Sequence, residues 1–353
     1  MSPNVAWVSG TEGTYARTTD RGKSWSIGTV PGAEKLDFRD VKAYGKTNAY
    51  LLSAGLGDAS RIYKTIDGGK SWAMQFKSTD PEAFLDAMAF WDEKNGIALG
   101  DPVKGLFQLI VTTDGGANWK PLVAKILPPA LPGEGAFAAS GTCLITQGES
   151  DVWFATGGAK ARVFHSKDRG QNWNVSETPI IAGAESAGIF SIAFRDKQHG
   201  MIVGGDYRKP DDTRATAATT SDEGKTWMLI DKQLPFRSAV AWAQDGWVAV
   251  GTSGSHFSQD DGATWKLLDR ENYNSVGFIP TGEGWAVGPK SRIAMFAKLV
   301  GLPSSHSYEC IDAVGSQSLG RQLRKKPRWF QHSCTVRATG LRRLSIFRSL
   351  GHK

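Results

Sequence analysis

Five carboxylates in the loops of the middle of the chain are the residues whose types and spacing could do chemistry. The carboxylates are Asp86, Asp101, Glu134, Glu185 and Asp206, and Arg208 lies close to the last of them in the sequence. If these loops meet on one face, the carboxylates form an acidic funnel with Arg208 as counter-charge. Two carboxyl groups on opposite sides of a bound sugar can act as general acid and base. The alternative is that each one is solvated or caps a turn.

Metal and cofactor sites are not predicted. The histidines His165, His199 and His256 lie in different parts of the chain, without the spacing of a metal site. The segment 55–60 begins like a dinucleotide-binding loop, but Ser60 takes the place of the last glycine and no strand–helix–strand unit follows. Cys143 is expected to be a small buried residue, because nothing in the sequence places a histidine beside it.

One eight-residue motif recurs six times and decides the architecture. It reads Ser/Thr-x-Asp-x-Gly-x-Ser/Thr/Asn-Trp, and we call each copy an Asp-box. Its aspartates are Asp20, Asp67, Asp114, Asp168, Asp222 and Asp260. Its tryptophans are Trp25, Trp72, Trp119, Trp173, Trp227 and Trp265. The tryptophans follow one another at intervals of 47, 47, 54, 54 and 38 residues, which is the length of a propeller blade.

The motif is typical of a tight hairpin turn. The aspartate is expected to accept backbone N–H groups across the turn, and the glycine to take a positive φ. The tryptophan then begins the next strand and packs between sheets. Because a catalytic acid is needed once or twice and this aspartate occurs six times, we interpret the boxes as structural.

Short apolar strands surround each box. A strand such as 96–100 or 247–251 precedes the box, and another precedes that strand, so each unit supplies about four strands. A seventh unit, with strands at 275–279, 284–288 and 292–296, has no box. The sequence therefore predicts an all-β, seven-bladed β-propeller over residues 1–300. The first and last blades are expected to be incomplete, because unit one starts at Val5 and unit seven stops early.

The six boxes resemble the BNR/Asp-box propellers, a repeat class found in sialidases and in photosystem II assembly factor-like proteins. The resemblance covers roughly residues 1–300, and it implies boxes at the blade periphery and an extracytoplasmic location. It does not fix the function, because glycosidases, binding proteins and assembly factors share the motif. Sialidases need an arginine triad with a Phe/Tyr-Arg-Ile-Pro motif. Here Arg39, Arg195 and Arg237 follow phenylalanines, but none continues as Ile-Pro.

The net charge of +7 comes from the end of the chain. Residues 301–353 hold ten Lys and Arg against two acids, a net of +8, so residues 1–300 carry −1. The main domain therefore gives no sign of a nucleic-acid partner. Residues 301–353 are expected to be a basic tail, disordered or foreign to the repeats, with few contacts to the propeller. No apolar run is long enough to span a membrane, and the first residues do not form a signal peptide.

The function that these observations favour is a monomeric, non-catalytic scaffold that presents its top face to a protein or peptide. Two alternatives stay open. One is a glycoside hydrolase or lyase that uses the funnel carboxylates. The other is a carbohydrate-binding protein that uses exposed aromatics such as Trp91 or Tyr207.

Overall fold

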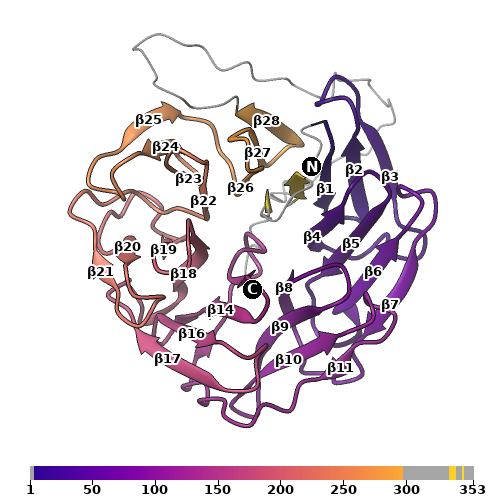
Figure 1. Ribbon diagram of the computed structural model, residues 1–353, viewed down its shortest axis with the longest axis horizontal. Helices are drawn as coiled ribbons and strands as arrows, with labels where there is room; N and C mark the ends of the chain where they lie inside the picture. The colour runs from indigo at the N-terminus through magenta and orange to yellow at the C-terminus, as the bar shows by residue number, and fades with distance from the viewer. Residues whose placement is uncertain (1–3, 297–333, 339–343, 346–353) are drawn as a thin grey trace, which may run out of the picture.

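Seven small antiparallel sheets stand around a central channel like the blades of a propeller (Figure 1). The computed structural model describes residues 4–296, 334–338 and 344–345. Within these residues the one helical element is a short 3-10 turn, η1 (Gly57–Ala59). The prediction of an all-β, seven-bladed propeller is confirmed.

Blades 2, 3 and 4 each have four strands, which follow one another in chain order from the channel outward. Blade 2 consists of β4 (Phe38–Tyr44), β5 (Asn48–Ser53), β6 (Arg61–Thr65) and β7 (Ala73–Lys77). Blade 3 consists of β8 (Leu85–Phe90), β9 (Gly96–Val103), β10 (Leu106–Thr112) and β11 (Lys120–Pro121). Blade 4 consists of β13 (Leu144–Gln147), β14 (Asp151–Ala155), β16 (Arg162–Ser166) and β17 (Trp173–Glu177).

Blades 5, 6 and 7 continue the ring. Blade 5 consists of β18 (Ala184–Phe194), β19 (Gly200–Asp206), β20 (Ala217–Thr220) and β21 (Met228–Leu229), and β18 also pairs with β15 (Gly157–Gly158), which pairs with β12 (Glu134–Gly135). Blade 6 consists of β22 (Ala239–Trp242), β23 (Trp247–Gly251), β24 (Gly254–Ser258) and β25 (Lys266–Asp269). Blade 7 has three strands among the described residues: β26 (Ser275–Phe278), β27 (Gly284–Gly288) and β28 (Arg292–Phe296).

Blade 1 combines strands from both ends of the chain. Its outer three strands are β1 (Ala6–Gly10), β2 (Thr14–Thr18) and β3 (Ser26–Thr29). On the channel side, β29 (Cys334–Ala338) pairs antiparallel with β1, and β30 (Leu344–Ser345) pairs with β29. In Figure 1, β29 lies beside β1. The first strand that unit one lacks is thus supplied by residues 334–338, which corrects the expectation that this part of the tail makes few contacts with the propeller. The rest of 301–353, apart from 344–345, lies outside the described residues.

The core lies between the blades. The second strand of a blade is buried on both faces, so it reads as an unbroken apolar run, as in β23, in which every residue is buried. The outermost strands, such as β3, face water. Each large apolar cluster draws on neighbouring blades; one joins Trp7 in blade 1 to Phe38 and Leu51 in blade 2. The tryptophan of a box packs towards the preceding blade, as Trp72 does against Trp7 with ring centroids 6.1 Å apart.

The six boxes form the turns between the third and fourth strands of their blades. Each box repeats the same pattern of internal hydrogen bonds. In blade 2, Asp67 Oδ1 accepts the backbone N–H of Ser71 at 3.0 Å, Oδ2 accepts its hydroxyl at 2.6 Å, and Thr65 Oγ1 accepts the N–H of Gly69 at 2.9 Å. Gly69 has φ of 88°. The Ser71 hydroxyl and N–H, together with the Thr65 hydroxyl, lower the pKa of Asp67 to about 2. These bonds lock the hairpin.

The two ends of the propeller differ in their loops. The box turns lie beside the turns between the first and second strands, as the bond from Gly115 N–H to Lys94 O at 2.9 Å shows. We call this end the box face. We call the opposite end the loop face. It carries the turns between the second and third strands and the crossovers between blades. A bond from the Ala159 N–H to the Gly133 carbonyl at 2.9 Å joins one such turn to one such crossover.

Candidate functional site

Three of the five predicted carboxylates share one hollow on the loop face. Asp101, Glu134 and Glu185 line a hollow of about 310 Å³, which we call the acidic hollow. Asp101 lies near the end of β9, Glu134 in the crossover from blade 3, and Glu185 near the start of β18. Four glycines complete the wall: Gly133, Gly135, Gly157 and Gly158. A Cβ at Gly157 would clash with the Phe137 ring, and one at Gly158 would clash with the Gly133 carbonyl oxygen, so these glycines let the loops around the hollow pack closely.

Glu134 holds the hollow together. Its side chain forms a buried ion pair with Arg162. Its Oε1 accepts the Arg162 Nε–H at 2.8 Å and the Thr156 hydroxyl at 2.6 Å, and its Oε2 accepts the backbone N–H of Leu131 at 2.8 Å. Both oxygens are thus engaged within the protein, which leaves Asp101 and Glu185 as the carboxylates open to a ligand.

Asp101 is half-buried, and its pKa is raised. Its Oδ1 accepts the backbone N–H of Ala136 at 2.9 Å. Burial raises the pKa of Asp101 to about 6, because removing the ionised carboxylate from water is unfavourable. Glu185 is exposed at the same hollow. The hollow therefore becomes fully anionic only above about pH 6.

Asp86 does not reach the acidic hollow. It lies at a bulge in β8, is fully buried, and forms no hydrogen bond of ordinary geometry with the described residues. Burial and then the Asp101 carboxylate raise the pKa of Asp86 well above its usual range. Asp86 therefore lies beneath the surface, where burial favours its protonated form, whereas the sequence places it in the funnel.

Asp206 and Arg208 lie next to the hollow but outside its lining. Asp206 is buried at the end of β19, where its Oδ1 accepts the backbone N–H of Arg208 at 2.9 Å. Arg208 is exposed, with its guanidinium 5.8 Å from the Tyr207 ring. Trp91 is buried and donates to the Asp151 carbonyl at 2.9 Å on the box face, so it does not offer an exposed ring for a sugar.

The three arginines considered for a sialidase triad do not come together. Arg39 lies near the start of β4 and Arg237 just before β22, whereas Arg195 follows the end of β18 and so lies at the opposite end of its blade. Arg39 pairs with Asp37, and Arg195 with Asp261. Arg237 is buried, with its Nη2 2.8 Å from His256 Nδ1. No sialidase-like carboxylate clamp is formed by these residues.

The histidines are likewise engaged in local pairs. His165 Nε2 lies 3.0 Å from Asp151, and His199 Nδ1 lies 2.9 Å from Asp196. Burial, followed by Arg237 and Arg270, lowers the pKa of His256 to about 4. Across the described residues, no group of three or more His, Cys, Asp or Glu is arranged to hold a metal ion. Cys143 is buried, as predicted.

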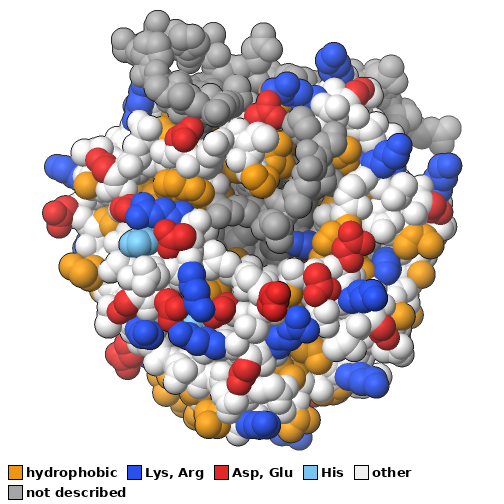
Figure 2. All heavy atoms as spheres, in the orientation of Figure 1, with side chains coloured by type: hydrophobic (Ala, Val, Ile, Leu, Met, Phe, Trp, Pro, Cys, Tyr) orange, Lys and Arg blue, Asp and Glu red, His pale blue; other side chains and the backbone are white. Residues whose placement is uncertain are grey.

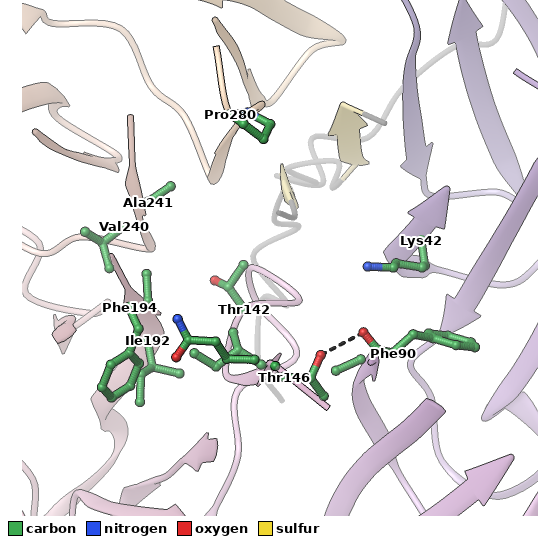
Figure 3. Close-up of a pocket in the computed structure, with 14 residues that line it drawn as sticks. Lys42, Phe90, Thr142, Thr146, Ile192, Phe194, Val240, Ala241 and Pro280 are labelled. Carbon is green, nitrogen blue, oxygen red and sulfur yellow. Dashed lines mark hydrogen bonds between the residues drawn. The ribbon is translucent and has the colours of Figure 1, made fainter. Parts of the chain in front are cut away.

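A second hollow, which the sequence did not reveal, lies at the box-face end of the central channel (Figure 3). Its volume is about 300 Å³, and we call it the channel site. The ends of the innermost strands of blades 2 to 6, with Pro280 of blade 7, form its walls. Lys42 lies in β4 beside two other buried charged residues, Arg39 and Asp40, so its sequence position does not single it out.

The surface is electrically mixed. On the face in Figure 2, Lys and Arg side chains are interspersed with Asp and Glu, without a field of a single sign. One group on the box face combines Lys167, Lys197 and Lys225 around Glu223. Among the described residues there is no helix with the length and hydropathy to cross a membrane.

Comparison with known proteins identifies the fold. The chain matches no protein-family model, and no curated protein sequence matches it. The WD40 domain of Neurospora crassa Pan2 aligns with a TM-score of 0.53 at 12% identity, over 81% of this chain and 82% of that one. YCF48 bound to D1 peptide aligns with a TM-score of 0.49 at 18% identity, over 75% and 78% of the two chains. The GH74 xyloglucanase of Xanthomonas campestris gives 0.32 at 16% identity, over 80% of this chain and 50% of that one. The Pan2 likeness supports the β-propeller architecture.

Proposed function

We propose that the chain is a non-catalytic binding scaffold of the Asp-box class that holds a protein or peptide partner on its loop face. The observation that carries the proposal is the acidic hollow, where Asp101 and Glu185 are open to a ligand while Arg162 is committed to Glu134. A Lys or Arg side chain of the partner fits this hollow by charge. Rigid strands hold the hollow, and loops shape it, as in other binding sites.

An oriented peptide library tests the proposal. We expect enrichment of peptides with a central lysine or arginine, and about fivefold or more weaker binding when norleucine replaces that residue. Glu185→Gln removes one charge from the hollow without touching the core, so it should weaken binding of the enriched peptide to a similar extent. Glu149→Gln is the matched control, because Glu149 is exposed on the box face. Equal binding of lysine and norleucine peptides would contradict the proposal.

A second function is favoured by one observation. Asp101, with a pKa of about 6, lines the same hollow as a second carboxylate, Glu185, and such a pair of carboxyl groups can supply the general acid and the base or nucleophile of glycoside hydrolysis. This supports a glycoside hydrolase. The test is release of reducing sugar from a panel of plant and bacterial polysaccharides. Turnover that disappears in both Asp101→Asn and Glu185→Gln would favour hydrolysis over the scaffold.

A further inference from the structure

We propose that the channel site binds a small monocarboxylate with a short apolar chain, through Lys42 on one side and an apolar wall on the other. The site lies at the opposite end of the propeller from the acidic hollow, so this inference does not rest on the proposed function.

The apolar wall is built by blades 5, 6 and 7. Ile192, Phe194, Val240, Ala241 and Pro280 line this side of the hollow. In Figure 3, Ile192, Phe194 and Val240 lie across the space from Lys42. Main-chain bonds fix the inner strands that carry them, so the wall is formed before a ligand arrives. An alkyl chain placed against it leaves water, and each buried methylene group strengthens binding.

Lys42 supplies the charge. Among the described residues that line the channel site it is the one ionisable side chain, and it is only 3% exposed. Figure 3 shows its ammonium group directed into the space, and the Tyr44 ring lies 5.3 Å from its Nζ. A positive charge in a poorly hydrated, mostly apolar hollow attracts an anion more strongly than a surface lysine does. The hollow therefore selects for a carboxylate and against an amine.

The polar groups that line the channel site with Lys42 narrow the class of ligand that fits it. Thr146 donates its hydroxyl to the Phe90 carbonyl at 2.8 Å, and Thr142 donates to Ser191 at 2.7 Å, so both hydroxyl protons are committed within the protein. Gln147 is different, because its Oε1 is buried and has no hydrogen-bond partner in the described part of the chain. Its amide is thus available to a ligand, and a half-turn of the amide group presents its N–H donors to a carboxylate. A ligand with one charged head and one apolar tail matches the charge of Lys42, the amide of Gln147 and the apolar wall.

Isothermal titration calorimetry at pH 7 with three probes of equal chain length tests the proposal. The probes are hexanoate, 1-hexanol and hexylamine. We expect hexanoate to bind the full chain at least about tenfold more tightly than 1-hexanol, a difference of about 1.4 kcal/mol, and hexylamine to bind more weakly than either. Lys42→Met keeps the length of the side chain without the charge, so it should reduce the preference for hexanoate over 1-hexanol to less than about threefold.

Two further variants keep the result interpretable. Lys46→Met is the matched control, because Lys46 is exposed on the same face and outside the lining, and it should leave binding unchanged. Ala193→Phe fills the hollow from a half-buried position on β18, so it should abolish binding of both hexanoate and 1-hexanol. Thermal melts of each variant verify folding. The proposal is overturned if wild-type protein does not bind hexanoate, if 1-hexanol binds equally well, or if the hexanoate preference survives in folded Lys42→Met or binding survives in folded Ala193→Phe.

Discussion

Asp101 Oδ1 accepts the backbone N–H of Ala136 at 2.9 Å, and this bond ties the second strand of blade 3 to the crossover that leads to blade 4. The contact shapes the acidic hollow. Because the same carboxyl is largely removed from water, its charge state links the stability of the propeller to pH.

Asp101→Asn should stabilise the protein above pH 6. The folded-state pKa is about 6 and the ordinary value is 3.8, so the contribution of this group to stability is fully present below pH 4 and is lost as the pH rises through 6. Asparagine keeps the Ala136 bond without a charge, so the variant should gain up to about 3 kcal/mol at pH 7. Urea unfolding at pH 4 and pH 7 measures this difference. Asp211→Asn, at an exposed position, is the control, and an unchanged pH dependence in Asp101→Asn would contradict the prediction.

Arg162→Met should be strongly destabilising. It leaves the Glu134 carboxylate buried without its cation, and the loss of one member of a buried pair costs about 3 to 5 kcal/mol. Chemical denaturation measures the loss, and adding Glu134→Leu should recover most of it because no charge then remains buried. Lys160→Met, in an exposed pair with Glu177, is the control. If Arg162→Met lowers the free energy of unfolding no more than this control does, the Glu134–Arg162 pair does not stabilise the crossover.

Asp222→Ala should weaken the fold and spare binding. The variant loses bonds from the Thr226 N–H at 3.0 Å, the Thr226 hydroxyl at 2.6 Å and the Thr220 hydroxyl at 2.7 Å. We expect about 1 to 2 kcal/mol less stability. The box lies at the opposite end from the acidic hollow, so peptide affinity should not change. Weaker peptide binding at an unchanged melting temperature would indicate that the boxes take part in binding.

A chain ending at residue 300 should be less stable and more prone to associate. Its truncation removes β29 and exposes the channel-side edge of β1, and free strand edges pair with other chains. We expect Tm to fall by several degrees, at roughly 2 to 4 °C for each kcal/mol lost in a chain of this size. Scanning calorimetry and sedimentation velocity at two concentrations measure both effects. A truncated chain with the same Tm that stays monomeric would restore the view that this segment is foreign to the propeller.

The architecture was predictable because it repeats. Six tryptophans at blade intervals, each after a glycine that needs a positive φ, specify the turns, and the apolar runs between them specify the buried strands. The site was predictable only as a set of residue types. Asp86 and Asp101 both border apolar strands, and nothing local shows that Asp86 is sealed inside while Asp101 reaches the hollow. That difference depends on the crossover at 134–139, which follows blade 3 in the chain and folds back over it.

Contacts between distant segments were the hardest part to predict. Lys42 looks like an ordinary strand residue until blades 5 and 6 close the other side of the channel. The pairing of β29 with β1 joins residues more than 300 positions apart, and the sequence of neither strand predicts that the two pair. The spacing of motifs along the chain predicts local turns well. Contacts between distant segments form only when the ring of blades closes, so spacing does not predict them.

The box turns lie at one end of the propeller and the crossovers between blades at the other, which has a consequence for how such a protein can change. The hairpins that fasten the blades are at one end, so insertions and exchanges at the other end alter recognition without loosening the ring. A graft of the segment 129–137 that comes from a propeller with different loops but retains Glu134, the partner of Arg162, would replace one ligand preference by another and leave the melting behaviour of the blades nearly as it was. The ring of blades can therefore stay the same while single crossovers are exchanged and the ligand specificity changes.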